Sequence, residues 1–471
     1  MSASATPIPA IDGFQTCEEL ATALAKGALS SAELVDLCLE RIAAHDAKLH
    51  AFVRVFEEQA RRAARAADEL RRSGRVAGPL HGIPLAIKDL YHYAGQPTGA
   101  GSRAWKAPLP GATATAVRRL EAAGMIVLGK THTVEFAYGG WGTNPVMGTP
   151  WNPWDLTVHR APGGSSSGSA VAVAGGLVPA ALGSDTGGSL RTPACFCGLI
   201  GFKTSRGLIG RGGVLPLALS LDTMGPLTRS VRDAALLVDA MAGPDALDPE
   251  TARSPRPDVF AGLERGIRGL RIGRLADEEL TPLAPDVRTL FDGTVAELET
   301  LGAHIETMKL PRRVEDYLRD AGDIMSAESY ANLSAVIDPP ESPVAPVIRE
   351  RIGRGRDISA ATYIRVLERR RADQAAFADA FDRLDALVAP ICQAPAPPLA
   401  EVDEAASPTL YGRFVNFLDL ASLAVPIGTM RGGLPMGLQI IVRRFDEGLA
   451  LRIGRAFELA RGGLVARPAG L

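Results

Sequence analysis

The feature of this 471-residue sequence that most constrains its fold is an alternation of short apolar runs with amphipathic stretches. The apolar runs have the length of buried strands, and the stretches between them have helical periodicity. Such alternation is typical of an α/β fold in which helices cover both faces of a mostly parallel or mixed sheet. Strands are predicted at 125–131, 270–275, 304–310, 385–391 and 433–442, at the end of 78–90 after a loop, and at the start of 178–189 before a glycine turn. Helices are predicted at 17–45 (broken at Gly27), 50–73, 113–124, 168–177, 230–243 and 285–302.

No internal repeat and no polar low-complexity linker divides the chain. We therefore expect a single large domain, residues 1–471, with a twisted mixed β-sheet. The N-terminal helices are expected to occupy about 1–75, and a core segment that contains the motifs described below is expected at about 76–245. Residues 311–360 are the most irregular stretch, with four prolines between 339 and 346, and are predicted to form a variable cap over a cleft.

Charge and composition exclude several classes of protein. The net charge is −2 and the pI is near 6.4, so no basic footprint for nucleic acid or an acidic membrane is present. The sequence has no run of 18 apolar residues, and its first residues lack a basic stretch followed by an apolar core, so we expect no signal peptide. Its five cysteines are scattered and odd in number, which indicates a reducing compartment. We expect a cytoplasmic protein.

Metal and nucleotide sites have no clear motif. The seven histidines form no His-x-x-x-His pair and have no carboxylate at ligand spacing. Neither Gly-x-x-x-x-Gly-Lys-Ser/Thr nor Gly-x-Gly-x-x-Gly after a strand occurs. We expect no metal and no cofactor.

The loop "APGGSSSGSA" at 161–170 is rich in serine and glycine. Ser166 is the centre of a Gly-x-Ser-x-Gly pattern, but an α/β-hydrolase would need a later histidine, and His304 on a predicted strand is the only one. A serine without a histidine needs another base. Lys88 follows the apolar run "GIPLAI", and a desolvated lysine can be neutral near pH 7.

A second loop, "GSDTGGSLR" at 183–191, is a glycine turn before a predicted helix. Successive N–H groups in such a turn converge on one point and can bind an oxyanion. A serine at its end, Ser189, could then attack a carbonyl group. The alternative is an ordinary tight turn with Ser189 as the N-cap of the helix.

Together, Lys88 in "GIPLAIKDL", the loop "APGGSSSGSA" and "GSDTGGSLRTPACFCGLIGFKTSRG" resemble the amidase signature family of serine hydrolases, and the resemblance covers nearly the whole chain. It implies that Ser189 is the nucleophile, Lys88 the base, and Ser165, preceded by a cis peptide bond, the bridging serine. Lys88 would take a proton from Ser165, which would take one from Ser189, and an acyl-enzyme would follow.

The resemblance also implies roles for neighbouring residues. The N–H groups of the turn would hold the oxyanion, an ion pair would support the turn, and an aromatic segment would form the acyl-binding wall, with ordinary core packing as the alternative for its aromatic side chains. The oxyanion donors are Thr186, Gly187 and Gly188 with Ser189, the ion pair is Asp185–Arg191, the wall residues are Tyr138, Gly139 and Trp141, and Asn416 and Asp419 would line the cleft.

The implied activity is hydrolysis of a linear C–N amide bond, with carbamate and urea-like bonds as further substrates. Two alternatives stay open: the glutaminase subunit of a tRNA-dependent amidotransferase, and a non-catalytic binding protein on the same fold. The expected partner is a small amide or carbamate, neither nucleic acid nor membrane is expected, and a homodimer is left open.

Overall fold

The computed structural model describes residues 11–256, 258–430, 432–463 and 466–471. Its strands are β1 (Phe52–Val55), β2 (Pro84–Lys88), β3 (Ile126–Thr131), β4 (Ala180–Asp185), β5 (Ile200–Lys203), β6 (Thr223–Thr228), β7 (Arg271–Leu275), β8 (His304–Met308), β9 (Ala386–Pro390), β10 (Ala421–Thr429) and β11 (Pro435–Val442). In these residues they form one 11-stranded sheet in the order β1-β3-β2-β4-β6-β5-β10-β11-β9-β7-β8. The single mixed sheet is the architecture that the alternation predicts.

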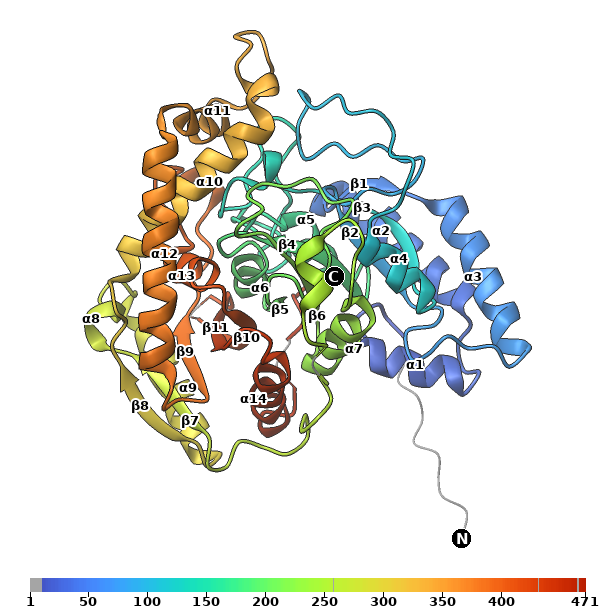
Figure 1. Ribbon diagram of the computed structural model, residues 1–471. Helices are drawn as coiled ribbons and strands as arrows, with labels where there is room; N and C mark the ends of the chain where they lie inside the picture. The colour runs from blue at the N-terminus through green and yellow to red at the C-terminus, as the bar shows by residue number, and fades with distance from the viewer. Residues whose placement is uncertain (1–10, 257, 431, 464–465) are drawn as a thin grey trace.

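Helices lie on both faces of the sheet (Figure 1). They are α1 (Cys17–Ala25), α2 (Ser31–Leu49), α3 (Glu57–Arg72), α4 (Thr115–Ala122), α5 (Ser167–Ala174), α6 (Arg191–Cys197), α7 (Val231–Met241), α8 (Asp277–Leu280), α9 (Pro285–Thr300), α10 (Val314–Ile337), α11 (Pro346–Gly353), α12 (Ala360–Phe381), α13 (Leu410–Phe417) and α14 (Glu447–Ala460). Helices α5 and α6 pack on each other and on central strands, as α7 and α14 do.

The direction of the central strands determines where a site can form. β2 pairs in parallel with both β3 and β4, so the carboxyl ends of the three strands lie at one edge of the sheet. The register places Ile87 of β2 opposite Leu182 of β4. Lys88 and the glycine turn after Asp185 are therefore brought together by neighbouring strands.

The prediction of one helix over 50–73 is wrong at its start. Phe52–Val55 forms the edge strand β1, which pairs antiparallel with β3, and α3 begins only at Glu57. The stretch "FVRV" contains β-branched and aromatic residues, and pairing with β3 outweighs the helical pattern that follows. Helix α2 begins with a capping box in which Ser30 and Glu33 satisfy each other's backbone N–H groups.

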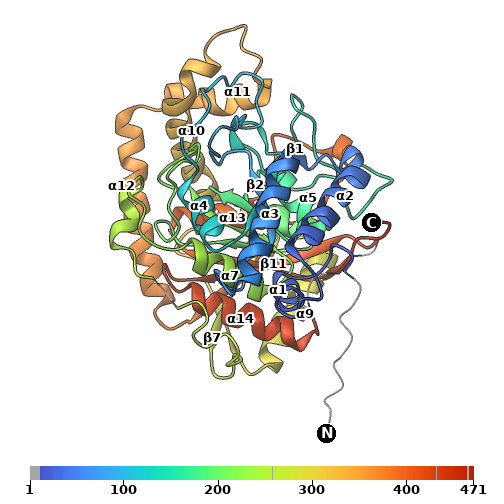
Figure 2. The same ribbon diagram turned by 90° about the vertical axis from the view of Figure 1, so that its right-hand side faces the viewer.

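Residues 311–360 are more regular than predicted. They contain the 24-residue helix α10 and the shorter α11. Pro339, Pro340 and Pro343 lie between these helices, and Pro346 occupies the first turn of α11, where a missing N–H costs little. Helices α10, α11 and α12 stand together at one side of the molecule (Figures 1 and 2).

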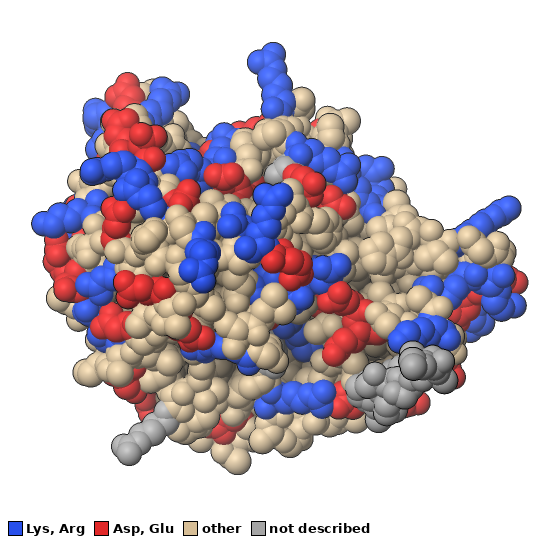
Figure 3. Space-filling view, turned by 90° about the horizontal axis from the view of Figure 1, so that it is seen from below, with Lys and Arg blue, Asp and Glu red and all other residues tan. Residues whose placement is uncertain are grey.

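The surface carries both signs of charge. Figure 3 shows basic and acidic side chains interspersed over one face of the molecule. No helix of the described residues has both the length and the hydropathy needed to cross a bilayer.

Candidate active site

Lys88 is the last residue of β2 and its side chain is fully buried. Its Nζ atom lies 2.7 Å from Ser165 Oγ, 2.9 Å from Ser184 Oγ and 3.1 Å from Ser166 Oγ. Burial lowers the pKa of Lys88 to about 7, although the carboxylates of Asp185 and Asp222 act in the opposite direction. A lysine in this environment can accept a proton near neutral pH.

Ser165 lies in the loop before α5, and neighbouring segments of the chain fix its position. The Gly164–Ser165 peptide bond is cis, and the Ser165 carbonyl oxygen accepts hydrogen bonds from Val134 N (3.2 Å) and Thr133 Oγ1 (3.0 Å). A Cβ atom on Gly164 would lie 2.7 Å from the backbone nitrogen of Gly142, so a larger residue would not fit. These contacts keep the Ser165 hydroxyl against Lys88.

Ser166 is tied to β4. Its Oγ atom donates to the Ser184 carbonyl (3.2 Å) and accepts from the Ser184 N–H (3.3 Å). A Cβ atom on the neighbouring Gly183 would lie 2.6 Å from Ser166 Oγ. The centre of the Gly-x-Ser-x-Gly pattern thus fastens the loop to the sheet, and it is fully buried.

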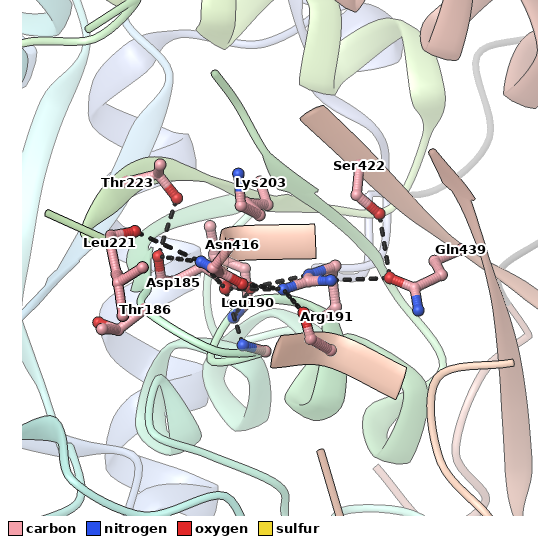
Figure 4. A network of polar contacts seen from close by, with 12 residues as sticks. Asp185, Thr186, Leu190, Arg191, Lys203, Leu221, Thr223, Asn416, Ser422 and Gln439 are labelled. Atoms are coloured by element: carbon pink, nitrogen blue, oxygen red, sulfur yellow. Dashed lines mark hydrogen bonds and ion pairs between the residues drawn. The ribbon is translucent and has the colours of Figure 1, made fainter. Parts of the chain in front are cut away.

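The glycine turn is built around the carboxylate of Asp185 (Figure 4). This carboxylate accepts hydrogen bonds from the N–H groups of Gly188 (2.8 Å) and Leu190 (3.0 Å), and it pairs with Arg191 at 2.9 Å. Burial raises the pKa of the Asp185 carboxyl, but the Arg191 guanidinium and the N–H donors outweigh burial and hold it below its ordinary value. Asp185 and Arg191 are both fully buried, so the turn rests on an ion pair without solvent access.

Some backbone N–H groups of the turn already donate hydrogen bonds within the protein, and others do not. The Gly188 N–H, predicted to hold an oxyanion, already donates to Asp185. The N–H groups of Gly187 and Ser189 have no acceptor in the described part of the chain. Thr186, the first predicted donor, uses its hydroxyl to bind Asp222 at 2.5 Å.

Ser189 opens onto a cavity of about 420 Å³ and is 8% exposed. Gly187 and the three predicted wall residues, Tyr138, Gly139 and Trp141, line the same cavity. The wall is fixed by polar contacts: Tyr138 Oη lies 2.9 Å from Ser326 Oγ, and Trp141 Nε1 donates to the Ala406 carbonyl at 3.1 Å. Its other side is formed by α10, α11 and the segment 404–409.

Asn416 and Asp419 do not line this cavity. Asn416 is 2% exposed, accepts a hydrogen bond from Arg191 (2.6 Å) and donates to the Asp185 carboxylate (3.0 Å) (Figure 4). Asp419 pairs with Arg206 (3.3 Å) and Arg444 (3.2 Å) instead. Their position in "FVNFLDL" brings them near the turn, but their side chains support the fold rather than face the cavity.

Sequence reasoning missed three residues of the site. Ser184 precedes Asp185 on β4 and binds Lys88, which the parallel pairing of β2 and β4 would have indicated. The Asp222 carboxylate accepts hydrogen bonds from the Thr186 hydroxyl and the Leu217 N–H, and burial raises the pKa of Asp222 to about 6. Arg413, on α13, lines the cavity although no motif marks it.

Among the described residues, no group of three or more His, Cys, Asp or Glu side chains could hold a metal ion.

Comparisons with known proteins agree on one family. The sequence model of the Amidase family matches residues 33–451. A glutamyl-tRNA(Gln) amidotransferase subunit from Myxococcus xanthus (strain DK1622) is 39% identical, over 94% of this chain and 96% of the relative.

Solved structures show the same relationship. A chain from a vestigial protein complex that reveals the evolutionary origins of an s-triazine catabolic enzyme superposes with a TM-score of 0.90 at 34% identity, covering 96% of this chain and all of that chain. Native peptide amidase from Stenotrophomonas maltophilia superposes with a TM-score of 0.85 at 32% identity, covering 98% and 99% of the two chains. With a family model that matches most of its length and relatives above 30% identity, this chain belongs to the amidase family.

Proposed function

We propose that this chain hydrolyses a linear carbon–nitrogen amide bond with Ser189 as nucleophile, Ser165 as relay and Lys88 as base. The observation that carries the proposal is the contact of a fully buried lysine with Ser165 at 2.7 Å, beside a turn whose Ser189 opens onto a cavity. A buried lysine needs compensation for its desolvation, and three serine hydroxyls surround this one.

The proposed reaction begins with proton transfer. Neutral Lys88 takes the hydroxyl proton of Ser165 as Ser165 takes that of Ser189, and Ser189 Oγ attacks the carbonyl carbon. The N–H groups of Gly187 and Ser189, with that of Thr186, stabilise the oxyanion. As the C–N bond breaks, Ser165 returns the proton to the leaving nitrogen. Water then attacks the acyl-enzyme and releases a carboxylic acid.

A fluorophosphonate probe is expected to label Ser189, as found by peptide mass spectrometry, because an activated serine attacks phosphorus as it attacks a carbonyl. Ser189→Ala should lose both labelling and turnover. Ser167→Ala is the matched control, since the Ser167 hydroxyl, at the start of α5, is buried without a hydrogen-bond partner among the described residues. Labelling of Ser166 that survives Ser189→Ala would contradict the assignment, and no labelling of the wild type would favour a non-catalytic binding protein.

A second candidate uses the same chemistry in a complex. The 39% identity to an amidotransferase subunit over 94% of this chain favours a glutaminase subunit that supplies ammonia to a partner. Simple amides, carbamates and ureas cleaved by the purified chain alone would support the free-standing enzyme.

The two candidates differ in their dependence on a partner. For the free-standing enzyme we expect ammonia release from simple amides at a rate that added partner proteins do not change, measured by a coupled glutamate dehydrogenase assay. Turnover restricted to glutamine, and dependent on a co-purifying protein, would instead establish the subunit.

A further inference from the structure

Arg413 enters the cavity from α13 without a counter-charge. Its Nη1 atom donates to the Leu318 carbonyl at 3.2 Å, and its Nε atom is buried without a hydrogen-bond partner among the described residues. No carboxylate within the described ranges forms an ion pair with it. Burial lowers the pKa of Arg413, so the surroundings do not fully compensate its charge.

The other arginines of the cavity are already neutralised. Arg351 pairs with Glu404 at 2.9 Å, Arg354 pairs with Glu350 at 2.7 Å, and Arg319 pairs with Asp316. Asp323 also lines the cavity, and within the described ranges it forms no ion pair with Arg413. Among the arginines that line the cavity in the described residues, Arg413 is thus the one without a carboxylate partner.

Two glycines make room for this side chain. A Cβ atom on Gly187, in the turn before Ser189, would lie 3.1 Å from Arg413 Cγ, so the side-chain stem lies against the turn. A Cβ atom on Gly322, within α10, would lie 3.2 Å from Arg413 Nη1. Glycine inside a helix costs about 1 kcal/mol relative to alanine, and here it leaves space around the guanidinium.

We propose that Arg413 binds a carboxylate of the substrate, so that the site prefers small amides that carry a carboxylate group, such as monoamides of short dicarboxylic acids. The inference rests on the proposed function of the same site. A guanidinium presents planar pairs of N–H donors that match the two oxygens of a carboxylate, and a ligand carboxylate would supply the missing counter-charge. Contact of the stem with Gly187 places this charge beside the turn that holds the reacting carbonyl.

The test compares succinic and glutaric acid monoamides with their methyl esters, which differ in charge but hardly in shape. For hydrolysis of the amide bond, the wild-type kcat/KM of at least one acid is expected to exceed that of its ester by about 100-fold. A charge-assisted contact in a partly buried site would give a preference of this size. Arg413→Met should remove that preference by lowering kcat/KM for the acid far more than for the ester. Arg413→Lys, which keeps the charge without the planar fork, should be intermediate.

Two further variants test whether the loss of any positive charge in the cavity, or poor folding of Arg413→Met, could explain the result. Arg354→Met removes a charge that Glu350 already pairs, and it should keep the preference for the acid. Gly322→Ala crowds the guanidinium without touching its charge and should raise KM for the acid more than for the ester, even if Arg413→Met folds poorly.

Binding gives a readout that does not need turnover. Glutarate should raise the melting temperature of Ser189→Ala and have no such effect when Arg413→Met is added. Equal loss of acid and ester turnover in Arg413→Met, or equal wild-type rates on both, would overturn the inference while leaving the proposed hydrolase intact. Amide turnover that survives Ser189→Ala would overturn the hydrolase mechanism instead.

Discussion

Replacing Lys88 by methionine is expected to lower kcat/KM for every amide substrate by about 10³- to 10⁴-fold, because the relay loses the base that lies at hydrogen-bond distance from Ser165. Methionine fills a similar volume in the buried position, so the fold should persist, as circular dichroism and the melting temperature can check. Wild-type rates in a folded Lys88→Met protein would show that another group activates Ser189.

The pH dependence of kcat/KM gives a second test of Lys88 as the base. Burial lowers the pKa of Lys88 to about 7, and the base acts in its neutral form, so kcat/KM should rise as the pH rises through about 7 and level off above it. Below that point it should fall about tenfold per pH unit. Because the Asp222 carboxylate raises the pKa of Lys88, Asp222→Asn should move the midpoint to lower pH. The same midpoint in the residual activity of Lys88→Met would contradict the assignment.

Asp185→Ala is expected to destabilise the protein by about 3–5 kcal/mol, because it leaves the fully buried Arg191 without its counter-charge. The N–H groups of Gly188 and Leu190 would lose their acceptor at the same time. Urea unfolding followed by fluorescence measures the change. Glu350→Ala, which breaks an exposed pair with Arg354, should shift the free energy of unfolding by less than about 0.5 kcal/mol.

The pair also gives the stability a defined pH dependence. Since the pKa of Asp185 is lower in the folded protein than its ordinary value, its contribution is present at neutral pH and is lost as the pH falls from about 4 towards the folded pKa. Replacing both members by apolar residues should recover much of the loss of the single variant. If Asp185→Ala unfolds at wild-type urea concentrations, the turn does not depend on the ion pair.

The sequence predicted the parts of this structure that local pattern controls. The apolar runs became β2, β3, β4, β7, β8, β9 and β11, and the helical pattern at 230–243 became α7. It failed for β1, which forms by pairing with the distant strand β3, and for α10, a long helix in a region that the nearby prolines suggested was irregular. The strands β5, β6 and β10 are sheet neighbours that no simple periodicity marks.

The candidate site likewise combines residues that the local sequence marks with residues that only the fold brings together. The motif residues Lys88, Ser165 and Ser189 lie in short loops or strand ends whose composition is unusual, so the sequence alone could propose them as candidates. Asp222 and Arg413 approach the turn from segments distant in sequence, and only the fold brings them there. Asn416 was assigned to the cavity from its place in the chain, whereas its hydrogen bonds direct it to the Asp185–Arg191 pair.

The cavity joins two stretches of chain with separate tasks. The predicted chemical groups come from residues 88–189, whereas much of the opposite wall comes from α10, α11 and the loop before α13. Mutations in the wall can therefore accumulate without moving the lysine or its serines. A lineage built this way can exchange substrates while inheriting one reaction, which fits a family whose members carry names as different as peptide amidase and glutamyl-tRNA(Gln) amidotransferase.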